Sequence, residues 1–125
     1  MESVGTQTHA VESVLKGGFD DHFWNAGGYF GRGAYFADDM NLSISFTGST
    51  NPRTIFVCSV LLGNVDDRSG APISEPLGPD FFPGHGHHSL KGRICYGNPP
   101  TVRQNEYIVY RYGQARIRYM LRFDM

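Results

Sequence analysis

The chain has 125 residues, which is enough for one domain with one hydrophobic core. Its formal net charge of -1 at pH 7 excludes the strongly basic balance of proteins that bind duplex nucleic acid or anionic membranes, so a small-molecule ligand is expected. The longest apolar run, residues 55–62, is too short to span a membrane, and residues 1–10 lack the features of a secretion signal, which predicts a soluble intracellular protein.

The first predicted element is a short amphipathic helix over residues 8–16. Apolar residues recur at helical spacing between Ala10 and Leu15, Thr8 can cap the first turn, and two glycines follow the last one. Residues 19–33 then mix turn-forming residues with aromatic side chains and keep no period, which predicts a long loop with anchored rings.

The pattern of residues 40–46 is ambiguous. Met40, Leu42, Ile44 and Phe46 alternate with polar residues, which favours a strand. The two aspartates that precede them are typical of a helix N-terminus, where acidic side chains lie at the positive end of the helix dipole. Periodicity alone favours the strand.

Three strands and a long loop are predicted in the second half. Residues 54–62 form an almost continuous apolar run, as in a central strand buried on both faces, whereas residues 66–86 carry four prolines and four glycines and predict a functional loop. Residues 105–112 and 116–123 both alternate, with a Gly-Gln-Ala turn between them that suits a hairpin. The predicted fold class is therefore α+β, built around an antiparallel sheet.

Alternation also assigns faces within the last two strands. Glu106, Ile108 and Tyr110 share one face of the first strand. Four residues share a face of the second, and the arginines that alternate with them are expected to form a solvated face. The four are Ile117, Tyr119, Leu121 and Phe123, and the arginines are Arg116, Arg118 and Arg122.

The cysteines and histidines do not predict a metal site. Cys58 lies inside an apolar run and Cys95 is far from it, so both are expected to be free structural thiols. His85, His87 and His88 have no cysteine or acidic partner at a suitable spacing nearby, and no metal is expected.

Three segments together carry a resemblance to a known family: YFGRGAYFADDMNLSISF at 29–46, GHHSLKGR at 86–93 and NEYIVYRYGQARIRYMLRF at 105–123. In order and spacing the chain resembles the catalytic domain of the poly(ADP-ribose) polymerase (PARP) family, the diphtheria-toxin-like ADP-ribosyltransferases. The resemblance implies a split antiparallel sheet around an NAD cleft. It also implies an enzyme that breaks the nicotinamide–ribose bond of NAD and passes ADP-ribose to a protein acceptor.

The resemblance also implies catalytic roles for two residues. Glu106, in NEYIVY, matches the triad glutamate, and Tyr35, in GAYFA, matches the triad tyrosine that lies against the nicotinamide ring. Cleaving this glycosidic bond develops positive charge on the ribose, so a carboxylate beside the sugar stabilises the transition state. Glu106 would supply that charge and hold a ribose hydroxyl.

Further NAD-binding roles follow from the same resemblance. Gly5, together with Thr6, matches the segment whose backbone holds the carboxamide, and Ser43 matches the serine that hydrogen-bonds it. Phe46 falls where the family usually has a second stacking tyrosine, so Tyr35 and Phe46 would clamp the pyridinium between two rings. The resemblance implies a helix after Ala37, which brings Ser43 and Phe46 onto one face. It places residues 20–28 on the donor side of the cleft and residues 66–86 on the acceptor side.

The sequence departs from the family pattern at Val4, which occupies the position of the triad histidine. Valine can neither donate nor accept the hydrogen bond that this histidine makes to an NAD ribose hydroxyl. We therefore expect mono- rather than poly-ADP-ribosylation, with a catalytically impaired module that binds NAD, ADP-ribose or a protein partner as the alternative. Residues 1–125 are interpreted as one catalytic domain that is cut short at its N-terminal strand.

Overall fold

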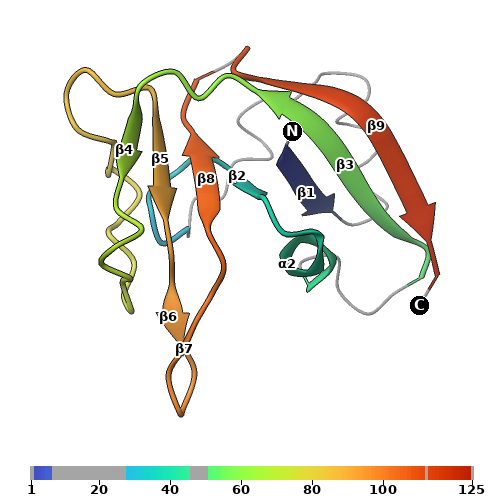
Figure 1. Ribbon diagram of the computed structural model, residues 1–125, viewed down its shortest axis with the longest axis horizontal. Helices are drawn as coiled ribbons and strands as arrows, with labels where there is room; N and C mark the ends of the chain where they lie inside the picture. Colours follow the sequence, from blue (N-terminus) through green and yellow to red (C-terminus); the bar gives the residue numbers. More distant parts are fainter. Residues whose placement is uncertain (1, 7–27, 46–50, 112, 125) are drawn as a thin grey trace.

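The computed structural model describes residues 2–6, 28–45, 51–111 and 113–124, and within these residues the chain is mainly β-strand with one short helix (Figure 1). The predicted helix at 8–16, residues 19–27 of the predicted loop at 19–33, and Phe46 lie outside the described residues. The elements are β1 (Glu2–Thr6), β2 (Ala34–Ala37), α2 (Met40–Ser45), β3 (Arg53–Val60), β4 (Val65–Asp67), β5 (Ser89–Gly92), β6 (Cys95–Tyr96), β7 (Thr101–Val102), β8 (Glu106–Val109) and β9 (Ala115–Phe123).

Seven of the strands form one sheet in the order β4-β5-β8-β2-β1-β3-β9, with β4 and β9 at its two edges (Figure 1). All its described ladders are antiparallel except β4–β5. The ladder between β1 and β2 contains a single pair, Ser3 with Ala37. One pair therefore joins the two halves of the sheet at this point, and the split sheet that the resemblance implies stays a prediction.

The predicted hairpin between the last two strands is wrong. β8 pairs with β2 on one side and with β5 on the other, so both of its edges are occupied and β9 pairs with β3 instead. Gln114 fixes the corner between the two strands. Its amide nitrogen donates hydrogen bonds to the carbonyls of Leu61 (3.1 Å) and His88 (2.9 Å), and its carbonyl Oε1 accepts one from the N–H of Arg111 (3.1 Å).

The predicted alternation along β9 holds from Tyr119 to Phe123 but is wrong at Ile117, because the register against β3 shifts between Val57 and Cys58. Tyr119 lies opposite Val57 and Ile117 lies opposite Cys58, and consecutive residues of a strand face opposite sides. Ile117 therefore does not share a face with Tyr119: it packs against a buried cluster, whereas Tyr119 is exposed.

The same shift divides the arginines of β9. Arg116 lies opposite Ser59 and Arg122 lies opposite Thr54, which are on different faces of β3. Arg118 donates a hydrogen bond from Nε to the Ser59 hydroxyl at 2.8 Å. All three arginines are exposed, as expected, but they do not form one face.

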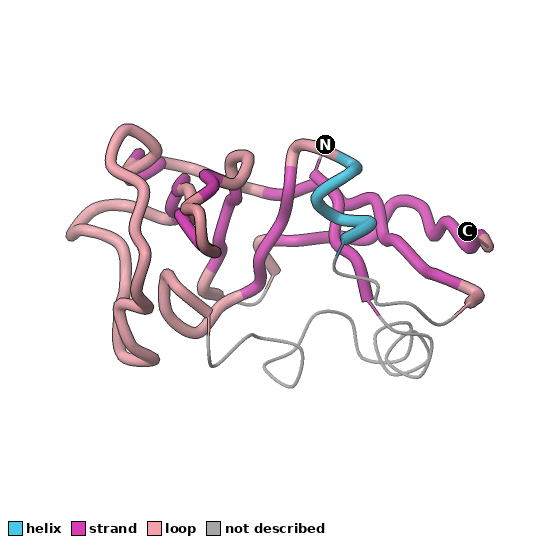
Figure 2. The backbone as a smooth tube through the Cα atoms, turned by 90° about the horizontal axis from the view of Figure 1, so that it is seen from below, coloured by secondary structure: helices cyan, strands magenta, loops and turns pink. Residues whose placement is uncertain are grey.

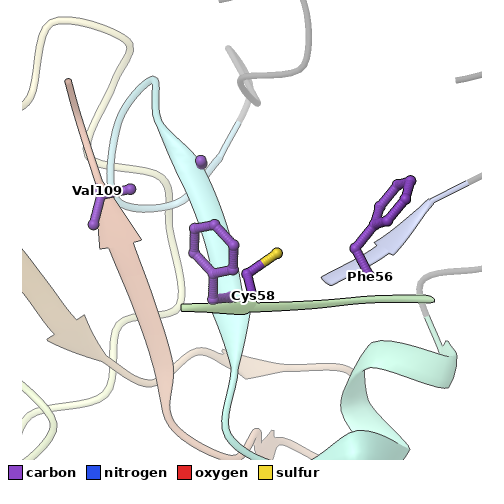
Figure 3. Packing of buried hydrophobic residues seen from close by; sticks show 5 residues of the cluster. Phe56, Cys58 and Val109 are labelled. Carbon is purple, nitrogen blue, oxygen red and sulfur yellow. The ribbon is translucent and has the colours of Figure 1, made fainter. Parts of the chain in front are cut away.

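Two buried clusters cover opposite faces of the sheet. One contains Phe56 and Cys58 of β3 together with Val109 of β8 (Figure 3). The other contains Leu90 of β5 and Ile108 of β8, and it lies on the face that also carries Glu106. The free thiol of Cys58 is fully buried, which confirms the prediction of a structural cysteine.

The ambiguous segment is a helix over Met40–Ser45, as the resemblance implied and against the periodicity. The Asp39 side chain accepts a hydrogen bond from the N–H of Asn41 (2.8 Å), and the Asp39 carbonyl accepts one from Leu42 (3.1 Å). This local capping decides the conformation of residues that alternation would assign to a strand. The helix follows β2 directly and packs against β1, β2 and β3 (Figure 2).

The predicted strand at 54–62 is observed as β3, and the predicted loop at 66–86 is observed except at residues 66 and 67, which belong to β4. β3 is fully buried at Ile55 and Phe56, which are consecutive and therefore face opposite sides. Residues 68–88 contain no regular element except an isolated bridge between Ile73 and Ile94. Among the described residues, no helix has the length and apolar character needed to cross a membrane.

Candidate active site

Glu106 lies in the middle of a row of three residues on neighbouring strands. It opposes Ala37 of β2 on one side and Gly92 of β5 on the other. Directly opposed residues of antiparallel strands point to the same face. Within this row only Glu106 carries more than a methyl group, so the neighbouring strands themselves put no bulky side chain beside its carboxyl.

The Glu106 carboxyl is buried and incompletely hydrogen-bonded. The residue is 2 % exposed, and its Oε2 atom has no hydrogen-bond partner among the described residues. Burial raises the pKa of Glu106 to about 7, and the nearby positive charge of Arg103 opposes this shift only in part. A buried carboxyl with a free acceptor atom and a pKa near neutrality is typical of a functional site.

Tyr35 lies on the same face as Glu106, one pair further along the β2–β8 ladder, opposite Ile108. Its hydroxyl accepts a hydrogen bond from the N–H of Phe30 (2.9 Å) and donates one to the carbonyl of Gly31 (2.5 Å). Burial raises the pKa of Tyr35, the bond from Phe30 lowers it, and the negative charge of Glu106 raises it further. The tyrosine is therefore neutral, and its half-buried ring stands on the face that presents the carboxyl.

The glycines before β2 allow the chain to pass close to Tyr35. A Cβ atom at Gly28 would collide with the Tyr35 hydroxyl. Gly31 adopts a φ of 85°, which disfavours other residues, and a Cβ there would collide with the carbonyl of Phe81. The rings and glycines of this segment thus form one packed unit around the tyrosine.

Gly5 and Thr6 lie at the end of β1, beyond the single pair that joins β1 to β2. They pair instead with Ile55 and Thr54 of β3, and Val4 pairs with Phe56. Ser43 lies in α2, which packs against β1 and β2. The structure therefore brings the backbone segments that carry Gly5, Thr6 and Ser43 to the junction between the two halves of the sheet, beside the strand of Tyr35.

The sequence analysis did not assign a role to Phe30 or Gly92, although both lie beside the predicted catalytic residues. Phe30 is buried, and Tyr110 donates a hydrogen bond of 2.6 Å from its hydroxyl to the Phe30 carbonyl. The one signal for this region in the sequence was that Glu106 and Tyr110 share a face of their strand. Among the described residues, no group of three or more His, Cys, Asp or Glu side chains is placed to hold a metal ion.

Comparison of the sequence with known proteins identifies the family of the chain. The family model of the poly(ADP-ribose) polymerase catalytic domain matches residues 4–125, and the chain belongs to this family. The family has the ADP-ribosyltransferase fold. The α+β class stays a prediction, because the described residues contain little helix.

Two relatives are named as mono-ADP-ribosyltransferases. The chain is 29% identical over 143 residues to protein mono-ADP-ribosyltransferase PARP3 of Gallus gallus, which covers 94% of this chain and 27% of the relative. It is 29% identical over 100 residues to protein mono-ADP-ribosyltransferase PARP4 of Mus musculus, which covers 77% of this chain and 5% of the relative. The chain thus spans about a quarter of the length of the first relative and about a twentieth of the second.

Proposed function

We propose that the chain is an NAD-dependent ADP-ribosyltransferase that transfers a single ADP-ribose unit from NAD to a protein acceptor and releases nicotinamide. The observation that carries the proposal is the position of Glu106, a buried carboxyl on the same face as Tyr35 whose Oε2 has no hydrogen-bond partner in the described part of the chain. A buried acceptor atom without a partner costs stability, and a ribose hydroxyl of bound NAD would satisfy it. Family membership and the printed names of the two relatives support the same reaction class.

In the proposed reaction, the bond between ribose carbon and nicotinamide nitrogen breaks and its electron pair leaves with neutral nicotinamide. The positive charge that develops on the ribose is stabilised by the ionised Glu106 carboxylate, which also holds a ribose hydroxyl. An acceptor nucleophile then binds the ribose carbon and loses its proton. Because Glu106 is buried, its charge acts through a medium of lower dielectric than water and is correspondingly more effective.

The remaining residues are proposed to hold the nicotinamide. Tyr35 and Phe46 stack on the two faces of the ring, the backbone of Gly5 and Thr6 binds the carboxamide, and Ser43 hydrogen-bonds it. The short β1–β2 ladder and the packing of α2 against both strands support this set, because β1 and α2 carry Gly5, Thr6 and Ser43 and both lie beside β2, the strand of Tyr35. No metal takes part in the proposal, and residues 1–125 act as one catalytic domain inside the cell.

A second candidate function is a module that binds NAD, ADP-ribose or a protein partner without turnover. The observation that favours it is Val4, which stands where the family has its triad histidine. Loss of one hydrogen bond to a ribose hydroxyl costs roughly 1–3 kcal/mol if the hydroxyl is left unpaired. Such a loss weakens NAD binding whether or not the chain turns over.

A transfer assay separates the two functions. The chain is incubated with NAD labelled in its adenylate part and with a mixture of candidate protein acceptors, and covalently bound label is read after denaturation. The enzyme predicts one label per modified site, and it predicts that Glu106→Gln removes the label. Label that is absent from the wild type, although NAD binds measurably, supports the non-catalytic module.

A further inference from the structure

Phe30 is held in place through both polar groups of its own backbone. Its N–H donates to the hydroxyl of Tyr35 on β2 (2.9 Å), and its carbonyl accepts from the hydroxyl of Tyr110 at the end of β8 (2.6 Å). Phe30 is 1 % exposed, and the Tyr110 bond is buried. Two tyrosines that are far apart in the sequence therefore fix one phenylalanine.

The Phe30 ring fills the space beside Gly92, which has no side chain. A Cβ atom at Gly92 would collide with Cζ of the Phe30 ring, so the tip of the ring stands where a Gly92 side chain would begin. Gly92 is the directly opposed partner of Glu106, and the Cβ positions of such partners lie about 5 Å apart. The ring tip is thus a neighbour of the Glu106 side chain on the β5 side.

We propose that Phe30 is a positioning residue that acts through Glu106: its ring closes the β5 side of the carboxyl against water, and the hydroxyls of Tyr35 and Tyr110 hold that ring in place. Gly92 has no side chain and Ala37 has only a methyl group. Among the described residues, the Phe30 ring is therefore the bulky group that this row places beside Glu106. Tyr35 therefore has two functions, because its ring faces the proposed nicotinamide site while its hydroxyl holds the backbone of Phe30 in place. The catalytic role of Phe30 rests on the proposed function, but the contacts of its ring and backbone do not.

The charged groups around Glu106 allow a clean test. Arg103 before β8 acts on the charge of Glu106, and this charge in turn acts on Tyr35 of β2. Lys91 and Tyr107 form the next pair of the β5–β8 ladder and therefore face the other side of the sheet, where the Lys91 ammonium lies 5.9 Å from the Tyr107 ring. Removal of the Phe30 ring consequently changes the access of water to Glu106 without removing a charge.

The test is a titration of Glu106 by carbon-13 NMR of the side-chain carboxyl, with Glu106→Gln used to assign the signal. The wild type is expected to titrate near 7, and Phe30→Ala is expected to lower this pKa by about one unit or more, towards the ordinary 4.5. Tyr110→Phe keeps every ring and removes only the bond to the Phe30 carbonyl, so it should shift the pKa in the same direction by less. Tyr107→Phe is the matched control on the opposite face and should leave the titration unchanged.

An unchanged Glu106 pKa in folded Phe30→Ala, or equal shifts in Tyr110→Phe and Tyr107→Phe, would overturn the inference. If Phe30→Ala does not fold, the comparison of the two Tyr→Phe variants decides alone. The titration uses no NAD, so it gives its answer even if the chain proves to be inactive. If the chain is active, the low-pH limit of nicotinamide release should move to lower pH in Tyr110→Phe and not in Tyr107→Phe.

Discussion

Glu106 on β8 and Tyr35 on β2 present their side chains on the same face of two adjacent antiparallel strands, because Glu106 opposes Ala37 and Tyr35 opposes Ile108. The two residues are 71 positions apart in the sequence and one pair apart in the ladder. This relationship makes a joint role in binding one ligand physically reasonable, and the charge of Glu106 already acts on the Tyr35 hydroxyl.

The pH dependence of nicotinamide release should follow the ionisation of Glu106. Burial raises its pKa to about 7, and the proposed mechanism needs the ionised form. The rate constant kcat/KM is therefore expected to rise about tenfold per pH unit below 7 and to level off above it. The measurement is a pH–rate profile between pH 5 and 9 at constant ionic strength. A profile that is flat between pH 5 and 8 would contradict the assignment.

Replacement of Glu106 should change stability in a pH-dependent way. The folded pKa lies above the ordinary 4.5, so the protonated side chain contributes stability that is complete below pH 4.5 and is lost as the pH rises through 7. Glu106→Gln cannot ionise, and we expect it to be more stable than the wild type by about 1–3 kcal/mol at pH 8. Urea unfolding at pH 8 and at pH 4.5 measures the difference. An advantage of the variant that is as large at pH 4.5 would rule out ionisation as its cause.

A side chain at Gly92 should displace the Phe30 ring. Gly92→Ala places a Cβ atom against that ring, and overpacking of this kind costs about 1–3 kcal/mol of unfolding free energy. Gly70→Ala is the matched control, because Gly70 has no heavy atom within 4 Å of the added Cβ and no positive φ. Thermal unfolding of both variants provides the measurement, and equal melting temperatures would be inconsistent with the packing described.

Restoring histidine at position 4 should strengthen NAD binding. The prediction rests on the family pattern at this position, because Val4 pairs with Phe56, which lies in the cluster on the face of the sheet opposite Glu106. A new hydrogen bond to an otherwise unpaired ribose hydroxyl is worth about 1–3 kcal/mol, which corresponds to roughly 5- to 150-fold in Kd. Isothermal titration calorimetry of Val4→His with NAD tests this, and Val4→Leu serves as the control. Equal affinities of the two variants would show that the position no longer faces the ligand.

Local patterns in the sequence predict which residues share a face of a strand better than they predict which strands pair. Alternation places Glu106 and Tyr110 on one face, because this signal is local, whereas no strand was predicted around Tyr35. The pairing of β9 with β3 is not local: it depends on β8 having both edges occupied and on the contacts of Gln114. The periodicity of β9 does not predict the register shift beside Cys58.

The helix over Met40–Ser45 and the position of the Phe30 ring could not be predicted from periodicity either. Alternation favours a strand for residues 40–45, but capping by Asp39 makes them helical. The second depends on Gly92 leaving space for a ring that arrives from sixty-two residues earlier in the chain. Such a relationship appears only when both segments are placed in the same sheet.

The most direct test of the account is the release of nicotinamide from NAD by the purified chain, with Glu106→Gln as the paired variant. The account predicts release by the wild type and a loss of at least about 100-fold in Glu106→Gln, because the variant keeps the shape of the side chain and removes its charge. Circular dichroism establishes that the variant is folded. Release that is equal in the two proteins, or absent from a wild type that is folded and supplied with saturating NAD, would contradict the central claim.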